Sequence, residues 1–411
     1  MRVALCGPYP LDAEDARHAD GTWHAMINLA EPLAAFGDIE LCVVSRSKRL
    51  RTTRRVRRDG MLLVHVPDPF PRLDYLLRRR IVTGAMRREV AAFAPDLVHA
   101  QGDVQFLFTA LTSPLPAVLT LHSIFATQTR ANGRDAPLAH RVAYHLTRRW
   151  ERQYLPRVRN LIAINAEIAT AVRERAPDAH IYRVDNPINP AFFELPDAQT
   201  RPAVLFVAQI SRRKGLHVLL DAFERIADED PAYQVRVVGG AAEDPAYEAE
   251  MRARYAHRVA RGQLAFLGPM RHEELYGEMS RCSVLCLSSF YEASPLVVVE
   301  AMAAGKPVVG TRVGDLEAVV ESAGAGRLVA PGDPGALAAA LRLVLRDPAL
   351  RRDMGARGRA AARLRAERTR AARLTVDVYH DILARERGRR DVRAGSHSVA
   401  RPEPTRTVTG R

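Results

Sequence analysis

Cysteine is scarce in this sequence: the chain has four cysteines among 411 residues. All four lie in short apolar segments without the paired spacing of a metal site. This excludes a disulfide-stapled scaffold and favours reduced core residues in a cytoplasmic protein. Long apolar runs are missing too, and none approaches the about 20 residues that a membrane-spanning helix needs. Residues 2–6 are predicted as a strand, and this apolar segment is too short for a signal peptide.

Aromatic residues make up only 6% of the chain and do not alternate with the basic residues. Because proteins that bind single-stranded nucleic acid stack bases on aromatic rings between basic side chains, this pattern argues against nucleic acid as a partner. The G-x-G-x-x-G fingerprint is missing after the first strand, so the sequence does not predict a nicotinamide cofactor. No Asp-x-Asp pair stands where it could bind a divalent cation. We therefore expect neither a metal nor a bound cofactor.

Basic residues, in contrast, are in large excess. An apolar content of 47% and a charged content of 26% are ordinary for a globular protein, and the length allows two domains. The net charge of +14 and the pI near 10.2 indicate an anionic partner: nucleic acid, anionic lipid or a phosphorylated substrate. Residues 46–58 hold eight basic residues and no acid, and a second basic stretch, 78–88, is interleaved with apolar residues. This pattern predicts peripheral contact with an anionic membrane; the alternative is a solvated loop and an ordinary helix face.

The most informative stretch is residues 283–311, which predict a strand, a helix and a second strand. An apolar run forms the first strand, and Ser294 followed by Pro295 predicts the N-cap and first residue of the helix. Gly305 is expected to end that helix, and a second apolar run follows it. Such a unit is the repeating element of a parallel sheet.

The helix in this stretch is apolar on every side except for Glu300. A buried carboxylate costs several kcal/mol without a hydrogen-bonding partner, so it requires a reason. A second acid, Glu292, precedes the helix. Between them the N–H groups of Leu296 and Val297 point out of the positive end of the helix, which favours a bound phosphate. The arrangement suits a phosphorylated ligand rich in hydroxyl groups; the alternative is a core helix whose Glu300 pairs with an arginine.

The order Glu292-x7-Glu300, then AMAAGKPVVGT, then Gly314 and Glu317, resembles the retaining glycosyltransferase family 4. The resemblance keeps good register over residues 204–329 and is weaker through the first half. It implies the α/β fold called GT-B, in which two Rossmann-like domains face each other across a cleft and a C-terminal helix crosses back to the first domain. It also implies that Glu300 holds the ribose hydroxyls of the donor and that Glu292 contacts the donor sugar.

A basic turn, QISRRKG, precedes a predicted helix in the second half. Lys214 and Gly215 match the Lys-Gly of the resembling family, which implies that Lys214 stabilises the leaving diphosphate. The family arginine that stands a few residues earlier is Gln209 here, so Arg212 or Arg213 is expected to replace it. The alternative is a solvated basic turn.

Two positions in the first half are also implicated by the resemblance. His122 directly follows the strand at 117–121, at the sheet edge where open α/β folds bind ligands, and is expected to reach the transferred sugar. The alternative is a lone surface histidine. Gly21 stands where the family has a Gly-Gly pair close to the sugar phosphate; the alternative is a simple helix-entry turn.

The resulting prediction is a metal-independent, retaining hexosyltransferase. It would move a sugar from a nucleotide-diphosphate sugar to a glycan or lipid-linked acceptor in cell-envelope or polysaccharide biosynthesis, in the cytoplasm or on the inner face of the membrane. The expected catalytic residues are His122, Lys214 and Glu292. The expected donor-binding residues are Gly21, Arg212, Arg213, Lys214, Glu292, Leu296, Val297 and Glu300. The alternatives are a nucleotide-sugar epimerase of the same fold and a non-enzymatic binder of anionic ligands.

Four segments are predicted along the chain. Residues 1–194 form the acceptor-side domain, 195–370 the nucleotide-sugar domain, 371–386 the crossover helix and 387–411 a disordered basic tail.

Overall fold

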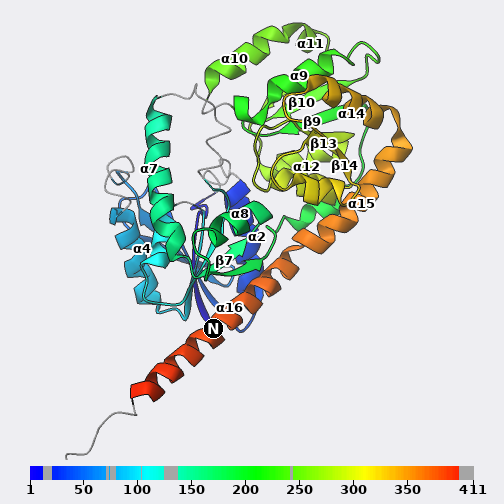
Figure 1. The fold of residues 1–411 in the computed structure, drawn as a ribbon. Helices are drawn as coiled ribbons and strands as arrows, with labels where there is room; N and C mark the ends of the chain where they lie inside the picture. Colours follow the sequence, from blue (N-terminus) through cyan, green and yellow to red (C-terminus); the bar gives the residue numbers. More distant parts are fainter. Residues whose placement is uncertain are drawn as a thin grey trace, which may run out of the picture.

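Two β-sheets organise the chain, and each lies at the centre of its own α/β unit (Figure 1). The computed structural model describes residues 1–12, 21–70, 74, 80–102, 104–124, 138–240 and 244–397. The first sheet has eight strands in the order β3-β4-β2-β1-β5-β6-β7-β8, and the second has six in the order β11-β10-β9-β12-β13-β14. Neighbouring strands are parallel, apart from β3, which pairs antiparallel with β4 at the edge. The predicted α/β class with two Rossmann-like sheets is confirmed.

The first unit alternates strands with helices up to the linker. Its strands are β1 (Arg2–Cys6), β2 (Glu40–Ser47), β3 (Arg54–Arg58), β4 (Met61–Pro67), β5 (Leu97–Gln101), β6 (Ala117–Leu121), β7 (Asn160–Ala163) and β8 (His180–Arg183). Its helices are α2 (Gly21–Ala35), α4 (Arg80–Phe93), α5 (Val104–Leu111), α7 (Leu138–Tyr154), η1 (Leu155–Arg157) and α8 (Ala166–Arg173). The central strands β1 and β5 are covered on both faces, so buried residues run through them without alternation.

The second unit repeats the pattern after the short helix η2 (Pro190–Glu194). Its strands are β9 (Ala203–Val207), β10 (Gln234–Val238), β11 (Leu264–Gly268), β12 (Val284–Leu287), β13 (Val308–Thr311) and β14 (Gly326–Val329). Its helices are η3 (Arg212–Lys214), α9 (Leu216–Glu224), α10 (Pro245–Arg254), α11 (Ala256–Ala260), α12 (His272–Arg281), α13 (Leu296–Ala303), the π-helical η4 (Glu317–Glu321), α14 (Pro334–Arg346) and α15 (Pro348–Ala366). Alternate residues of β9 enter opposite cores: Val204 and Phe206 pack with α9 and α14, whereas Leu205 packs with α12 and α13.

The last helix, α16 (Arg368–His397), leaves the second unit and crosses the first (Figure 1). It packs on α2, and its Tyr379 is fully buried against the first sheet, where its hydroxyl lies 2.7 Å from Nδ1 of His99. The prediction of disorder from residue 387 is wrong for 387–397, which are helical. This segment is rich in arginine, a good helix former, and an Arg389–Glu386 ion pair one turn apart supports it. The rest of the predicted tail, residues 398–411, lies outside the described residues.

The two units meet at the carboxyl ends of their strands. Asn165, which follows β7, donates from Nδ2 to the carbonyl of Ala293 beyond β12 at 2.8 Å. Arg183 at the end of β8 pairs with Asp315 beyond β13 at 3.1 Å. These are the edges at which parallel α/β sheets bind ligands, so the functional site is sought between them. None of the helices in the described part of the chain is long and apolar enough to cross a membrane.

Candidate active site

The start of α13 presents free backbone donors towards this region. The prediction that Ser294 caps the helix is wrong: Pro295 is the N-cap, because its backbone is extended at φ −73° and ψ 113°, and Leu296 is the first helical residue. No side chain among the described residues caps it. Since the first N–H groups of a helix have no partner within the helix, those of Leu296 and Val297 remain available to an anion.

Lys214 and Glu292 form a buried ion pair beside this helix start. Nζ of Lys214 lies 2.6 Å from Oε1 and 2.9 Å from Oε2 of Glu292, and the hydroxyl of Ser289 donates to Oε1 at 2.6 Å. The two side chains are only 16% and 7% exposed. The sequence predicted both residues for the site but not their contact. The contact places a cation and an acid side by side, with a small part of the lysine exposed to solvent.

Two glycines hold the backbones of this pair in place. Gly215 follows Lys214 with φ +68°, and a Cβ there would lie 2.1 Å from the carbonyl oxygen of Ser288. Gly314 has φ +56°, and a Cβ there would lie 1.9 Å from the carbonyl oxygen of Glu292. Both distances are far below van der Waals contact, so only glycine allows the chain to pass so closely.

The two candidate arginines lie differently. Arg213 is half-buried and donates from Nη1 to the carbonyl of Tyr291 at 3.2 Å, directly before Glu292 in the chain. Arg212 points to the outer surface, where its side chain is 63% exposed and pairs with Glu250 at 2.7 Å. Of the two, Arg213 is therefore the one next to the Lys214–Glu292 pair.

Glu300 is buried, as predicted for a residue of an apolar helix, and is 3% exposed. Its partner is a histidine and not the arginine of the alternative: Nε2 of His272 lies 3.0 Å from Oε1 of Glu300. His272 begins α12, and the ring of His24 from α2 of the first unit lies 3.8 Å from it between ring centroids. Neither histidine was predicted as part of the site from the sequence. Their places close to the carboxyl ends of β11 and β1 were the signal that could have identified them.

His122 lies at the end of β6, and its Nε2 is 3.2 Å from Oε1 of Gln101 at the end of β5. Burial lowers the pKa of His122 to about 4, so the ring is neutral near pH 7 and can exchange a hydrogen bond with a hydroxyl group. Gly21 begins α2, and a Cβ built there would lie 3.9 Å from Cδ1 of Leu296 in the other unit. The structure thus brings Gly21 to the start of α13, while no contact among the described residues joins His122 to the Lys214–Glu292 pair.

Metal ligands do not cluster in the described part of the chain: no group of three or more His, Cys, Asp or Glu side chains there could hold an ion. The charged groups near the helix start are Lys214, Arg213 and Glu292, of which Glu292 is paired with Lys214.

Two families together cover most of the chain. Residues 188–361 match the family described as "Glycosyl transferases group 1", and residues 19–192 match "Glycosyltransferase Family 4". The two matches meet close to the linker between the sheets, so each corresponds to one unit.

Curated relatives resemble part of the chain. Glycogen synthase of Mycobacterium tuberculosis (strain CDC 1551 / Oshkosh) is 34% identical over 195 residues, which are 47% of this chain and 45% of the relative. D-inositol 3-phosphate glycosyltransferase of Corynebacterium jeikeium is 36% identical over 153 residues, 36% of each chain. The chain therefore matches less than half of the length of these relatives.

Solved structures resemble the whole fold. Sucrose-phosphate synthase from Thermosynechococcus elongatus superposes with a TM-score of 0.73 at 22% identity, covering 93% of this chain and 99% of the other. Anabaena HepE in complex with UDP-glucose superposes with a TM-score of 0.64 at 18% identity, covering 92% and 99%. With this two-unit fold and both family matches, the chain belongs to glycosyltransferase family 4, the group 1 glycosyl transferases of GT-B fold.

Proposed function

We propose that this glycosyltransferase takes a nucleoside-diphosphate sugar as donor and transfers the sugar with retention at its anomeric carbon, without a divalent metal or other cofactor. The observation that carries the proposal is the Lys214–Glu292 pair, with contacts of 2.6 and 2.9 Å, beside the uncapped start of α13. Retention is proposed from the family resemblance.

Breaking the bond between sugar and diphosphate leaves negative charge on the diphosphate. Preorganised cations and backbone dipoles lower the free energy of the transition state when they point to where this charge develops. Nζ of Lys214 and the N–H groups of Leu296 and Val297 offer such groups without a metal. Glu292, fixed by Lys214 and Ser289, would accept hydrogen bonds from the sugar, and the neutral His122 would contact a sugar hydroxyl from the other unit. Glu300 would bind the ribose.

The test begins with the donor. A thermal-shift panel of UDP, GDP and ADP, followed by their sugars, should single out one nucleotide, and UDP-glucose comes first because the Anabaena HepE structure carries it. Lys214→Ala should lower the single-turnover rate of transfer by about a hundredfold. If no metal is needed, the wild-type rate should be the same with and without EDTA. If no nucleotide raises the melting temperature, the donor proposal is wrong. Conversion of the donor without any acceptor would favour an epimerase instead.

The acceptor is proposed to be a glycan or a lipid-linked molecule of cell-envelope or polysaccharide synthesis. The names of the relatives add a glucan and an inositol phosphate to the acceptors worth testing. For the lipid-linked case the first unit offers a basic edge: all five residues of β3, sequence RRVRR, are exposed. An Arg55–Glu89 pair at 2.7 Å joins this strand to α4, where Ile81 is 49% exposed. Residues 78 and 79 of the second basic stretch lie outside the described residues.

The membrane contact has its own test. Vesicles with anionic lipid should carry the protein upward in a flotation gradient, because each basic residue near such a surface contributes about 1 kcal/mol. Replacing Arg54 and Arg57 by glutamate should leave it at the bottom. Uncharged vesicles serve as the control. Equal flotation of the wild type and the double variant would contradict a role for β3.

A further inference from the structure

A cluster of aromatic side chains from both units surrounds the ring of His272, which contacts the carboxylate of Glu300. His272 lies at its centre, with Nε2 3.0 Å from Oε1 of Glu300. His24, from α2 of the first unit, packs on the His272 ring at 3.8 Å between centroids. Phe192 meets the ring edge-on at 5.3 Å, and Tyr276 stacks on it at 6.1 Å. The imidazole is therefore restrained by several neighbours, one of which belongs to the opposite unit.

Charge also distinguishes the two histidines. Burial alone lowers the pKa of His272, but the charge of Glu300, the hydrogen bond to it and the charge of Glu273 together raise the pKa above its usual value. Burial, and then the charge of His272, lower the pKa of His24 to about 4. A proton on the pair thus resides on His272, from which it is donated to the buried carboxylate, and His24 packs against it as a neutral, tilted ring.

Only one oxygen of Glu300 is used in this contact. Oε1 accepts from His272, while Oε2 has no hydrogen-bond partner among the described residues and is available to a ligand. The side chains of His272 and Glu300 are 12% and 4% exposed, so water competes little for the carboxylate. A carboxylate held by a donor on one oxygen presents the other in a defined direction.

We propose that His272 is a positioning residue that orients Glu300 towards the ribose hydroxyls of the donor, and that His24 supports it from the first unit. The inference rests on the proposed function, since it requires a ribonucleoside diphosphate to lie against Glu300. It makes His272 a determinant of the preference for ribose over a sugar without hydroxyl groups. It also links ribose binding to the approach of the two units, because His24 reaches His272 only when α2 lies close to α12.

The test compares two ligands that differ only in these hydroxyl groups: UDP and 2′,3′-dideoxy-UDP, with affinities from calorimetric titration. For the wild type we expect tighter binding of UDP. In His272→Leu the preference should fall roughly tenfold or more, since a hydrogen bond to a charged group is lost, while affinity for the dideoxy analogue stays the same. His272→Gln keeps an N–H donor at a similar reach and should restore much of the preference. His24→Ala should reduce it in the same direction, by less.

A matched control lies in another part of the second unit. His257 also contacts a glutamate, Glu224, at 3.1 Å, but on the outer surface, so His257→Leu should leave the preference unchanged. Equal loss of both ligands in His272→Leu would show a merely structural role and overturn the inference, as would an unchanged preference. An unchanged preference in His24→Ala would overturn the contribution from the first unit. Failure of the wild type to bind any nucleoside diphosphate would overturn the proposed function, and the inference with it.

Discussion

At the scale of single residues, the site depends on where cations are placed relative to two buried acids. Arg213 lies next to Glu292 through its bond to the carbonyl of Tyr291, whereas Arg212 is exposed and paired with Glu250. We predict that Arg213→Ala lowers the single-turnover rate by about a hundredfold, because a donor beside the diphosphate is lost. Arg212→Ala, its neighbour and matched control, should change the rate little. The reverse order of effects would assign the missing family arginine to Arg212.

The sequence predicted several residues of the candidate site, but not the contacts that these residues make. Glu292, Glu300 and Lys214 stand out because charged residues in apolar or helix-entry segments require a reason. Their partners could not be derived, since the contact of Glu300 with His272 spans 28 residues of the chain and depends on how α12 packs against α13. The local pattern around His272, an ordinary amphipathic helix start, carries no sign of this contact.

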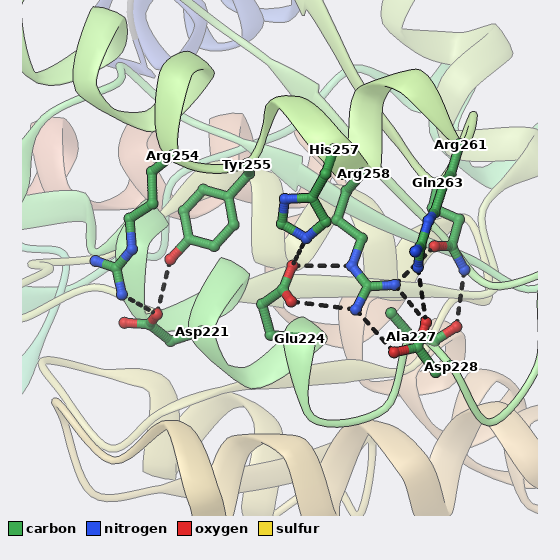
Figure 2. Close-up of polar contacts among 10 residues, drawn as sticks. All are labelled: Asp221, Glu224, Ala227, Asp228, Arg254, Tyr255, His257, Arg258, Arg261 and Gln263. Atoms are coloured by element: carbon green, nitrogen blue, oxygen red, sulfur yellow. Dashed lines mark hydrogen bonds and ion pairs between the residues drawn. The ribbon is translucent and has the colours of Figure 1, made fainter.

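At the scale of elements, one buried arginine connects α11 to the end of α9 (Figure 2). The side chain of Arg258 is 4% exposed and bonds to Glu224 at 2.9 Å and to Asp228 at 2.6 Å. Its Nη1 also donates to Gln263 Oε1 at 3.0 Å, and Gln263 in turn donates to the carbonyl of Ala227 at 2.7 Å. The N–H groups of the guanidinium are thus satisfied by acceptors within the second unit.

We predict that Arg258→Ala destabilises the protein by about 2 kcal/mol, because it leaves the buried amide oxygen of Gln263 without its donor. The measurement is the midpoint of urea unfolding. Arg261→Ala provides the control, since Arg261 pairs with the same Asp228 from an exposed position and should leave the midpoint almost unchanged. Equal shifts in both variants would contradict the role given to burial.

Elements at the margins were the hardest to predict. The sequence RRVRR lacks the alternation of a half-buried strand, so it does not by itself predict β3, which pairs antiparallel with β4 at the sheet edge. The end of α16 was predicted to be disordered because it is poor in apolar residues, yet helix propensity along an already formed helix extends it to His397. Strand pairing forms β3 and helix propagation extends α16, and neither is visible in local composition.

At the scale of the whole molecule, α16 fastens the second unit onto the first through a buried polar contact. His99 is fully buried, with Nδ1 2.7 Å from the hydroxyl of Tyr379 on α16 and Nε2 2.7 Å from that of Thr120 on β6. Burial, and to a lesser degree the charge of His122, lower the pKa of His99 to about 3. The ring is therefore neutral in the folded protein throughout the range in which an unfolded histidine, with a pKa near 6.5, takes up a proton.

This difference gives the stability a defined dependence on pH. Below about pH 6.5 the unfolded chain binds a proton at His99 that the folded chain does not. The free energy of unfolding therefore decreases by about 1.4 kcal/mol for each unit by which the pH is lowered, down to about pH 3. His24 and His122, whose pKa values are lowered to about 4, act in the same direction.

We predict that urea unfolding shows this loss of stability between pH 6.5 and 4.5. In His99→Gln the slope should decrease by about one proton, because the titrating group is gone. Thr120→Val, which removes a partner of His99 but not the titrating ring, should lower stability at every pH and keep the slope of the wild type. A wild-type slope in His99→Gln would show that His99 is protonated in the folded molecule, and the contact with α16 would then need a different account.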